Sequence, residues 1–317
     1  MRKFGSLLFP PFLCTLLVCA LASAAAGVCK VNVVFQHPPK RTKNFEQILS
    51  RAEGGDRTAQ FEAGVAFETG TGAEQDYDAA AQWYRRAADS GSVAAQNNLG
   101  GMFLRGLGVP QDDAEALRWY SRAAVEGYLP AQNNVGFMHA SGRGTRTNDE
   151  EAVRWYRRAA EKGYAPAQSN LAFMYSQGRG VPPDGAEAVR WYRKAAAQNY
   201  APAEYKLGLL YYEGRVIPAD IDEGLLWLQR AAEHGSAPAE NQIASAYEHG
   251  KGVALSYDQA VRWYRMAAEH GLAEAKQNLA ILAAHGVPAM KGASEASSQG
   301  PGTKLERGAA FWGKGPE

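Results

Sequence analysis

The stretch AQSNLAFMYSQGRGVPPDGAEAVRWYRKAAAQNY, residues 167–200, holds two apolar helical patterns separated by a loop rich in glycine and proline. In its first part Ala167, Leu171 and Met174 follow the i, i+4, i+7 spacing that puts side chains on one face of a helix. A similar spacing recurs in the second part, at Ala188, Trp191, Tyr192, Ala195 and Ala196. The stretch therefore predicts two helices, over residues 167–177 and 185–198.

The loop between these helices carries signals for a helix end and a helix start. We expect Gly178-Arg179-Gly180 to end the first helix in the left-handed conformation that glycine adopts at low cost. The extended run Val181-Pro182-Pro183 then leads to Asp184, whose carboxylate can cap the second helix. Comparable helix starts are expected near Asp113, Asp220 and Asp258.

The same pattern repeats along the chain with a period of 36 residues. Six of the 7 tryptophans follow it, at Trp83, Trp119, Trp155, Trp191, Trp227 and Trp263. A second series with this period is Ala59, Ala95, Ala131, Ala167, Ala203, Ala239 and Ala275. A third marks the end of each second helix, where a left-handed residue is expected: Gly55, Gly91, Gly127, Gly163, Asn199, Gly235 and Gly271. Such a period is typical of a repeat protein.

Small residues recur where the two helices of a unit must touch. One position of the first helix is occupied by Gly64, Gly100, Gly136, Ala172, Gly208, Ala244 and Ala280. Small side chains let helix backbones approach while tryptophan and tyrosine fill the neighbouring space. We predict an all-α fold, a right-handed α-solenoid of stacked antiparallel helix pairs. In this fold the tryptophans belong to the core and do not form a ligand cage.

The unit pattern, A-x-x-x-L-G-x-x-Y-x-x-G-x-G-V-x-x-D-x-x-x-A-x-x-W-Y-x-x-A-A-x-x-G, resembles the Sel1-like repeat, a relative of the tetratricopeptide repeat. Six units cover residues 59–274, with a half-unit before them (45–58) and another after them (275–285). The fifth unit departs most, because Gly214-Arg215-Val216 lacks the second loop glycine and Trp227-Leu228 replaces Trp-Tyr. The 36-residue register continues through it.

The N-terminus has the features of a secretory signal peptide over residues 1–26. Arg2 and Lys3 precede an apolar run at residues 7–22, and Ala22-Ser23-Ala24 or Ala24-Ala25-Ala26 supplies a small-residue cleavage site. The alternative is an uncleaved membrane anchor, since residues 4–28 carry no charge. Cleavage predicts an exported protein, in a bacterial periplasm or secreted, with the endoplasmic reticulum lumen as the alternative, and no stable membrane insertion.

Two segments lie outside the repeats. Residues 27–44 form a basic lead, and residues 286–317, rich in glycine, proline and serine, are expected to be a flexible tail. Phe311-Trp312 in this tail is either a docking motif or a leftover apolar end. Signal cleavage would leave Cys29 as the one cysteine, so an internal disulfide is excluded. Its thiol would be free, paired between molecules, or lipidated.

Composition and motifs argue against several kinds of chemistry. Lysine and arginine number 34 against 33 acidic residues, a balance that does not favour nucleic-acid binding. His139 takes an aromatic packing position, and His234 and His270 are expected to complement helix dipoles and cap carbonyl groups. One mature cysteine cannot build a cysteine-based zinc site. We therefore predict no catalytic residues, no metal and no cofactor.

The candidate site lies on the first helices of the units, which are expected to line a concave face. Positions two, three and six residues after the Ala167 position project away from the buried face. Apolar side chains flanked by amides there suit an extended peptide. The predicted backbone-binding amides are Asn98, Asn133, Asn134 and Asn170. The predicted side-chain-binding residues are Phe137, Phe173, Tyr205 and Leu209. The alternative is that the apolar residues pack against the adjacent first helix and the asparagines form bonds between repeats.

The resemblance implies a non-enzymatic scaffold or adaptor whose partner is a protein or an extended peptide segment. The alternative is a β-lactamase-like or penicillin-binding activity, which has been linked to some cysteine-rich relatives. Those relatives carry paired cysteines in their repeats, whereas residues 45–285 of this chain contain none.

Overall fold

The computed structural model describes residues 41–285, and within that range helices are the regular elements. The predicted signal peptide (1–26) and tail (286–317), with Cys29 and Trp312, lie outside the described residues. The helices are α1 (Lys43–Glu53), α2 (Arg57–Thr69), α3 (Tyr77–Asp89), α4 (Val93–Arg105), α5 (Asp113–Val125), α6 (Leu129–Ser141), α7 (Asp149–Glu161), α8 (Ala165–Gln177), α9 (Gly185–Ala196), α10 (Ala201–Glu213), α11 (Ile221–Glu233), α12 (Ala237–His249), α13 (Tyr257–Glu269) and α14 (Ala273–Ala284).

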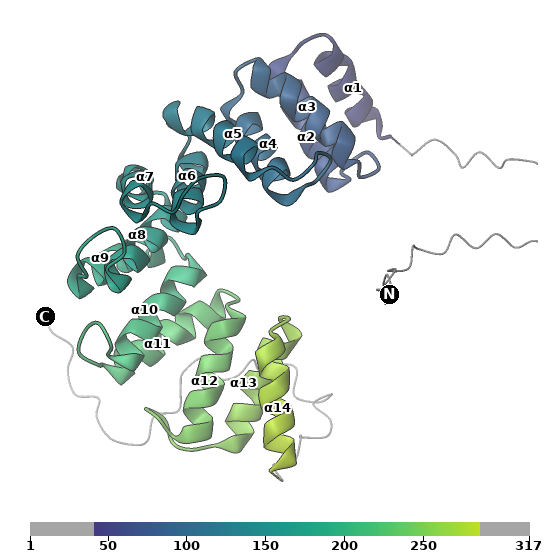
Figure 1. Ribbon diagram of the computed structural model, residues 1–317. Helices are drawn as coiled ribbons and strands as arrows, with labels where there is room; N and C mark the ends of the chain where they lie inside the picture. The colour runs from purple at the N-terminus through teal and green to yellow at the C-terminus, as the bar shows by residue number, and fades with distance from the viewer. Residues whose placement is uncertain (1–40, 286–317) are drawn as a thin grey trace, which may run out of the picture. The chain divides into compact units, whose positions relative to one another are not determined.

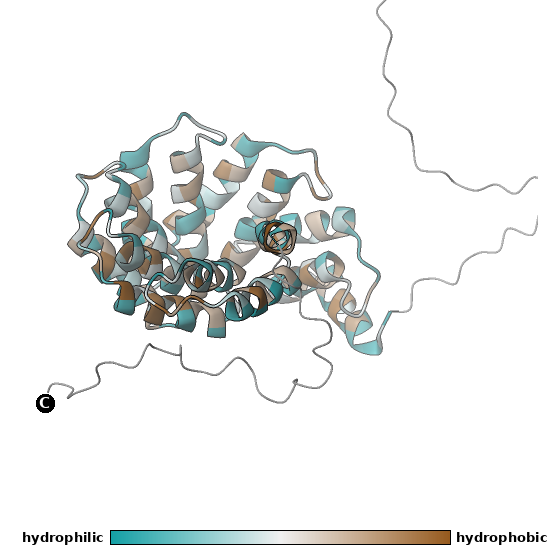
Figure 2. Cartoon of the chain, turned by 90° about the horizontal axis from the view of Figure 1, so that it is seen from below, coloured by the Kyte–Doolittle hydropathy of each residue, from teal (hydrophilic) through white to brown (hydrophobic). Residues whose placement is uncertain are grey.

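Each helix packs mainly against the helix before it and the helix after it in the chain. From α2 onward, an even-numbered helix is the first helix of a unit and the odd-numbered helix that follows is the second. The six units follow one another in order from α2 to α13 (Figure 1). Figure 2 shows that the helices mix hydrophobic and hydrophilic residues, as expected where one face of each is buried. The predicted all-α solenoid of stacked helix pairs is confirmed.

Residues with positive φ end the helices as the sequence predicts. Gly178 closes α8 with φ 64°, and the equivalent glycines close α2, α4, α6, α10 and α12 in the same left-handed conformation. After the second helices, the predicted glycines also have positive φ, between 80° and 90°. Asn199 takes that place after α9 with φ 57°, as the one non-glycine residue with positive φ in the described range. Asparagine tolerates this conformation better than most side chains do.

Helices start near Asp113, Asp220 and Asp258 as predicted. Asp184 and Asp220 cap α9 and α11, each accepting from the backbone N–H three residues later. At α5, however, the cap is Asp112, which accepts from the N–H groups of Ala114 and Glu115. At α13 the cap is Ser256. Asp113 and Asp258 lie inside their helices, because the cap is the residue immediately before the first helical one.

The contact within the first three units is a tyrosine ring lying on a glycine. A Cβ added to Gly100 in α4 would lie 2.9 Å from Cδ1 of Tyr120 in α5, and one on Gly136 would lie 2.7 Å from Cδ1 of Tyr156. Tyr84 and Leu228 cover Gly64 and Gly208 in the same way. The fourth and sixth units use Ala172 and Ala244 at this position, both completely buried. The small-residue series is therefore the place where the paired helices approach most closely.

The six tryptophans of the repeat lie on the second helices, and three of them belong to the buried core as predicted. Trp119, Trp191 and Trp263 are buried, with 5–8% of their surface exposed, whereas the other three are half-buried. In five units a cationic side chain three residues further along the helix covers the indole ring. Arg122, for example, lies 4.5 Å from the ring centre of Trp119. This cation–π contact shields the outer side of the ring from water.

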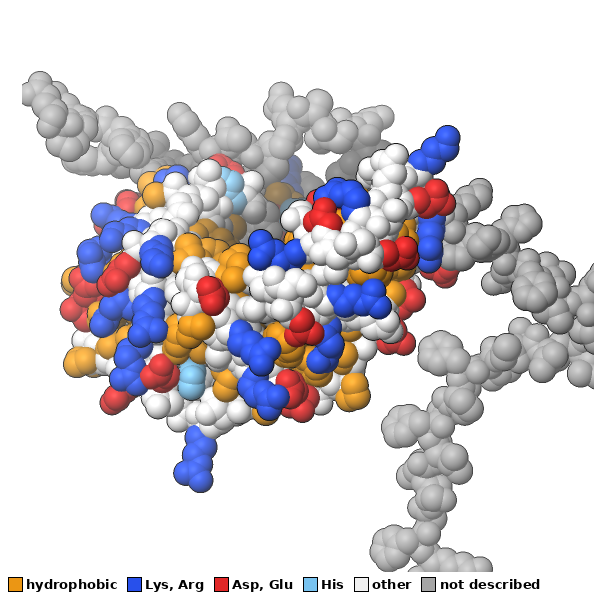
Figure 3. Space-filling model, turned by 90° about the horizontal axis from the view of Figure 1, so that it is seen from above, with side chains coloured by type: hydrophobic (Ala, Val, Ile, Leu, Met, Phe, Trp, Pro, Cys, Tyr) orange, Lys and Arg blue, Asp and Glu red, His pale blue; other side chains and the backbone are white. Residues whose placement is uncertain are grey.

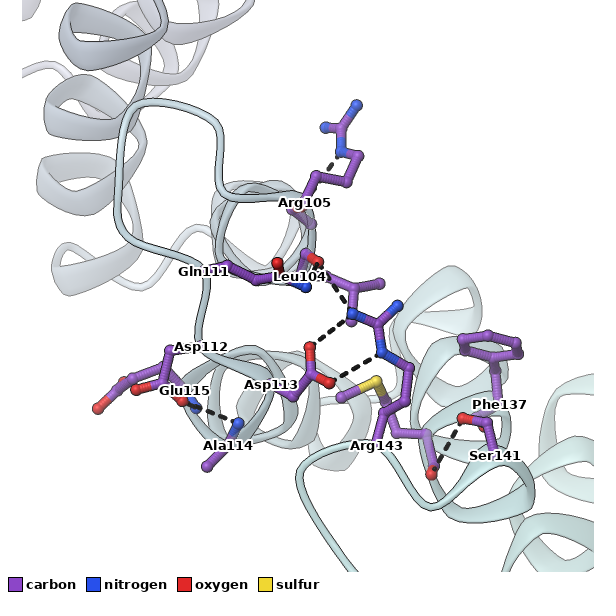
Figure 4. A network of polar contacts seen from close by, with 12 residues as sticks. Leu104, Arg105, Gln111, Asp112, Asp113, Ala114, Glu115, Phe137, Ser141 and Arg143 are labelled. Carbon is purple, nitrogen blue, oxygen red and sulfur yellow. Dashed lines mark hydrogen bonds and ion pairs between the residues drawn. The ribbon is translucent and has the colours of Figure 1, made fainter. Parts of the chain in front are cut away.

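An arginine in the loop connects some units to the preceding one. Arg143 donates from Nε and Nη2 to the two carboxylate oxygens of Asp113, at 2.9 and 2.6 Å, and from Nη2 to the carbonyl of Leu104 at 3.1 Å (Figure 4). Arg179 forms the same three bonds with Asp149 and Ala140. The Arg143 guanidinium holds the pKa of Asp113 below its usual value. These bidentate pairs explain why the loop carries Gly-Arg-Gly at these two positions.

The approach of tyrosine to glycine leads to the first prediction. Gly100→Val is expected to lower the free energy of unfolding by about 1–3 kcal/mol, because the new side chain meets the Tyr120 ring. Gly101→Val is the matched control on the same helix, since a Cβ there first meets the Tyr120 hydroxyl at 3.5 Å. Both changes alter helix propensity equally, so chemical denaturation should separate the packing effect. Equal stability of the two variants would contradict the close approach.

Candidate functional site

The predicted apolar residues lie on α6, α8 and α10, which are first helices of their units. We call the surface formed by the even-numbered helices the first-helix face. Phe137 in α6 and Phe173 in α8 are exposed, at 44% and 38% of their surfaces. Tyr205 and Leu209 in α10 are half-buried and pack against the core of the following units. The face thus presents two phenylalanine rings in the same position of consecutive units.

The asparagines of this face bond to one another across unit boundaries. Asn134 Nδ2 donates to Asn97 Oδ1 at 2.9 Å, and Asn170 Nδ2 donates to Asn133 Oδ1 at 2.8 Å. Asn98 accepts from Asn97 Nδ2 at 3.3 Å. These contacts agree with the alternative interpretation of the asparagines, in which they form bonds between repeats. The bonds connect adjacent first helices.

A hollow of about 340 Å³ lies between α8 and α10. Phe173 and Leu209 line it together with Tyr192, and Lys206 and Glu213 bring charge to it. The structure thus brings two of the four predicted apolar residues into one hollow. Phe137 and Tyr205 do not line it. Burial raises the pKa of Tyr192, so its phenol is neutral at physiological pH.

A second hollow of about 270 Å³ lies between α2 and α4 and contains Asn98. Its charged groups are paired, since Arg105 Nη2 lies 3.0 Å from Glu68 Oε1. The Tyr84 hydroxyl donates to the other oxygen of Glu68 at 2.7 Å. Burial raises the pKa of Tyr120, which also lines the hollow, to about 12. Asn98 is therefore separated from the hollow that holds Phe173 and Leu209.

Both signs of charge and hydrophobic side chains alternate on the face seen from above in Figure 3. No three side chains of His, Cys, Asp and Glu gather into a metal-binding group within residues 41–285. In the same range, no helix has the length and apolarity needed to cross a membrane.

Two histidines end α11 and α13 as C-caps, with backbone N–H groups that donate to the last carbonyls, and their side chains contact buried glutamates, which the sequence did not predict. His234 Nδ1 lies 2.6 Å from Glu204 Oε2, and His270 Nδ1 lies 2.9 Å from both carboxylate oxygens of Glu240. Both glutamate side chains have 0% of their surface exposed. His139, by contrast, is half-buried on α6, as its aromatic packing position predicts.

A signal for these pairs was present in the repeat. The position of Glu204 and Glu240 is glutamine in the four preceding units, where Gln132, for example, donates to the Ala124 carbonyl at 3.1 Å. The sequence changes to glutamate in the two units that have histidine 30 residues later. Tracking each position along the units, in addition to each motif within a unit, would have found the pairing.

This stack of helix pairs defines the class of the protein, an α-solenoid repeat protein. The family model of the Sel1 repeat matches six consecutive segments, residues 58–92, 93–128, 129–164, 165–200, 201–236 and 237–272. The chain therefore belongs to the Sel1 repeat family, as its sequence pattern indicated. Proteins of this family are generally scaffolds for protein–protein interactions.

Solved structures of similar proteins support the assignment. The crystal structure of c5321, a protective antigen present in uropathogenic Escherichia coli strains and displaying an SLR fold, has 33% identity and a TM-score of 0.66 over 79% of this chain. The match spans 54% of that protein, about half its length. A Sel1 repeat protein from Oxalobacter formigenes has 30% identity and a TM-score of 0.64, covering 72% of this chain and 97% of its own. Among curated proteins, none matches this chain.

The buried glutamate–histidine pairs lead to the second prediction. His270→Ala is expected to lower the free energy of unfolding by about 1–3 kcal/mol, because it removes a hydrogen-bonding partner from the buried Glu240 carboxyl. Adding Glu240→Gln should restore most of this loss, since an amide can donate to the Ala232 carbonyl as Gln132 does to Ala124.

Chemical denaturation of wild type, single and double variants measures both effects. A His270→Ala protein as stable as wild type would show that the imidazole contributes nothing. A double variant no more stable than the single one would show that the glutamine arrangement cannot replace the pair.

Proposed function

We propose that this chain is a non-enzymatic adaptor that binds an extended peptide or protein segment on the first-helix face, centred on the hollow between α8 and α10. The observation that carries the proposal is the exposed Phe173 ring beside Leu209 in a hollow of about 340 Å³. An exposed aromatic ring in a concave site that also carries polar groups is the kind of feature that receives a side chain of a bound segment.

The charges at this hollow suit a peptide backbone and its flanking side chains. Lys206 and Glu213 line the hollow together, so groups of either sign on a partner can be matched there. Phe137, one unit earlier, extends the apolar surface along the stack. Because the asparagines already bond to one another, specificity would rest on the aromatic and charged side chains more than on an amide ladder.

A peptide selection tests this site. Phage-displayed random peptides would be selected on the purified protein and their affinities measured on variants. We expect Phe173→Ser to weaken the selected peptides about tenfold, which corresponds to about 1.4 kcal/mol. Leu226→Ser is the matched control, because Leu226 is comparably exposed, at 44% against 38% for Phe173, but lies on the second helix α11.

Unchanged affinity for Phe173→Ser, with the fold intact by circular dichroism, would show that peptides do not bind at this hollow. Equal losses for Phe173→Ser and Leu226→Ser would show unspecific apolar adsorption.

We further propose that the protein is exported and works outside the cytoplasm. The support is the sequence of residues 1–26, with Arg2 and Lys3 before an apolar run and a small-residue end. A solenoid whose described residues contain no cysteine is also insensitive to an oxidising compartment.

Intact-mass measurement of the protein expressed in a bacterial host checks this export. We expect protein recovered from the periplasm or the medium to lack residues 1–26 and to begin at Gly27. Full-length protein confined to the cytoplasm would contradict export, and full-length protein in the membrane fraction would favour the uncleaved anchor.

A further inference from the structure

The N-terminal helix α1 is a second helix that has no first helix to pack on. Ile48 in α1 holds the position that Tyr84 holds in α3, one period of the repeat later. In the complete unit, the ring of Tyr84 lies on Gly64 of the first helix α2. No described helix precedes α1, so the residues that a first helix would cover remain uncovered.

These residues form an apolar hollow of about 510 Å³ at the end of the stack. Ile48 and Asn44 line it from α1, and Phe61, Glu62 and Val65 line it from α2. Val65 holds the repeat position of Leu209, which lines the hollow between α10 and the preceding first helix α8. The hollow therefore has the position of a missing first helix.

The C-terminal helix α14 is the complementary case, a first helix that has no described second helix after it. Ala280 holds the small-residue position of Gly64, and no tyrosine lies on it, so it is exposed. Ala283 and Ala284, on the same half of the helix, are also exposed. Ile281, with 51% of its surface exposed, holds the repeat position of Phe173, which lines the hollow toward the next first helix. This helix thus presents the small, apolar face that a second helix packs against in every complete unit.

We propose that α14 of one molecule occupies the hollow at α1 and α2 of a second copy of this chain. The two half-units would then form one complete unit, with Ile48 lying on Ala280 as Tyr84 lies on Gly64. The contact repeats an interface that the chain already uses between α2 and α3. Small residues on one partner face larger ones on the other, as in the helix pairs within the chain.

The register of this contact also matches a polar pair. Each unit has an alanine of the series Ala59, Ala95, Ala131 near the start of its first helix. The residue two positions after this alanine bonds to the residue three positions after the alanine of the following unit, as Asn97 does with Asn134. Between copies these positions are Gln277 on α14 and Glu62 on α2. The Gln277 amide can donate to the Glu62 carboxylate, so donor and acceptor are complementary at the new junction.

Because the two contacting surfaces differ, this association is head-to-tail and does not close by two-fold symmetry. Each added copy leaves one α1 end and one α14 end free, so molecules would add in a chain until a ring closes or the concentration limits growth. A single helix pair is a small interface, and the association is expected to be weak.

A complementation experiment tests the proposal. Sedimentation of the full wild-type protein should show an average mass that rises with concentration, up to about 100 µM, as suits a weak interface. Ile281→Glu blocks the α14 end, and Ile48→Glu blocks the α1 end, so each variant alone should remain monomeric. An equimolar mixture of the two should form a 1:1 dimer that grows no further, since each variant retains the end that the other lacks.

Thermal unfolding of each variant checks that the variant is folded. Asn44→Arg provides a second block of the α1 end, because Asn44 is exposed and its replacement leaves the core intact. A wild-type protein that stays monomeric would overturn the proposal, as would variants that assemble like wild type. A monomeric mixture would also overturn it, because it would mean that the two ends do not meet, as when another segment of the same molecule fills the hollow.

Discussion

The contact of an aromatic ring with a glycine that has no Cβ is the constraint on which the whole stack depends. It lets the two helices of a unit approach until Tyr120 lies on the backbone of Gly100, and it recurs with small adjustments in each unit. Where alanine replaces glycine, as at Ala172, the neighbouring ring is still buried and the pair is kept. Close approach maximises dispersion contacts over short helices that could not be stable alone in water.

Contacts between units are more varied than contacts within them. Bidentate arginine–aspartate pairs join the second and third units to the units after them. Asparagine pairs cross three of the boundaries between first helices. In a solenoid each unit contacts its neighbours alone, so each boundary can use its own chemistry without disturbing the others. This freedom explains why the repeat is regular in its apolar positions and irregular in its polar ones.

The two ends of the described stack are not equivalent to its middle. An internal helix is covered on both sides, whereas within residues 41–285 no first helix precedes α1 and no second helix follows α14. The uncovered face of α1 is the one with which a second helix contacts its first helix, and the uncovered face of α14 is the one with which a first helix contacts its second helix. The adaptor surface on α8 and α10 is separate from both ends, so peptide binding and end-to-end association do not compete for the same residues.

Much of the fold could be predicted from the sequence because it depends on local and periodic signals. Helix ends follow from glycine and Asn199, and the core follows from the spacing of alanine, tyrosine and tryptophan. The candidate site was predicted less well. Exposure of Phe137 and Phe173 follows from helical geometry, but the sequence left open whether the asparagines bind a partner or bond to one another, as they do in the structure. A position on a helix face does not reveal whether a neighbouring repeat already satisfies the side chain.

The sequence by itself determined the repeat, its period, the helix pairs and the family, because each depends on residues close in the chain or one period apart. The tertiary structure alone decided which polar groups meet across repeats and where hollows form. Asn134 contacts Asn97, 37 residues away, and Phe173 shares a hollow with Leu209. These outcomes depend on the distance and rotation between stacked units, which are set by packing over many side chains and are not encoded in any single motif.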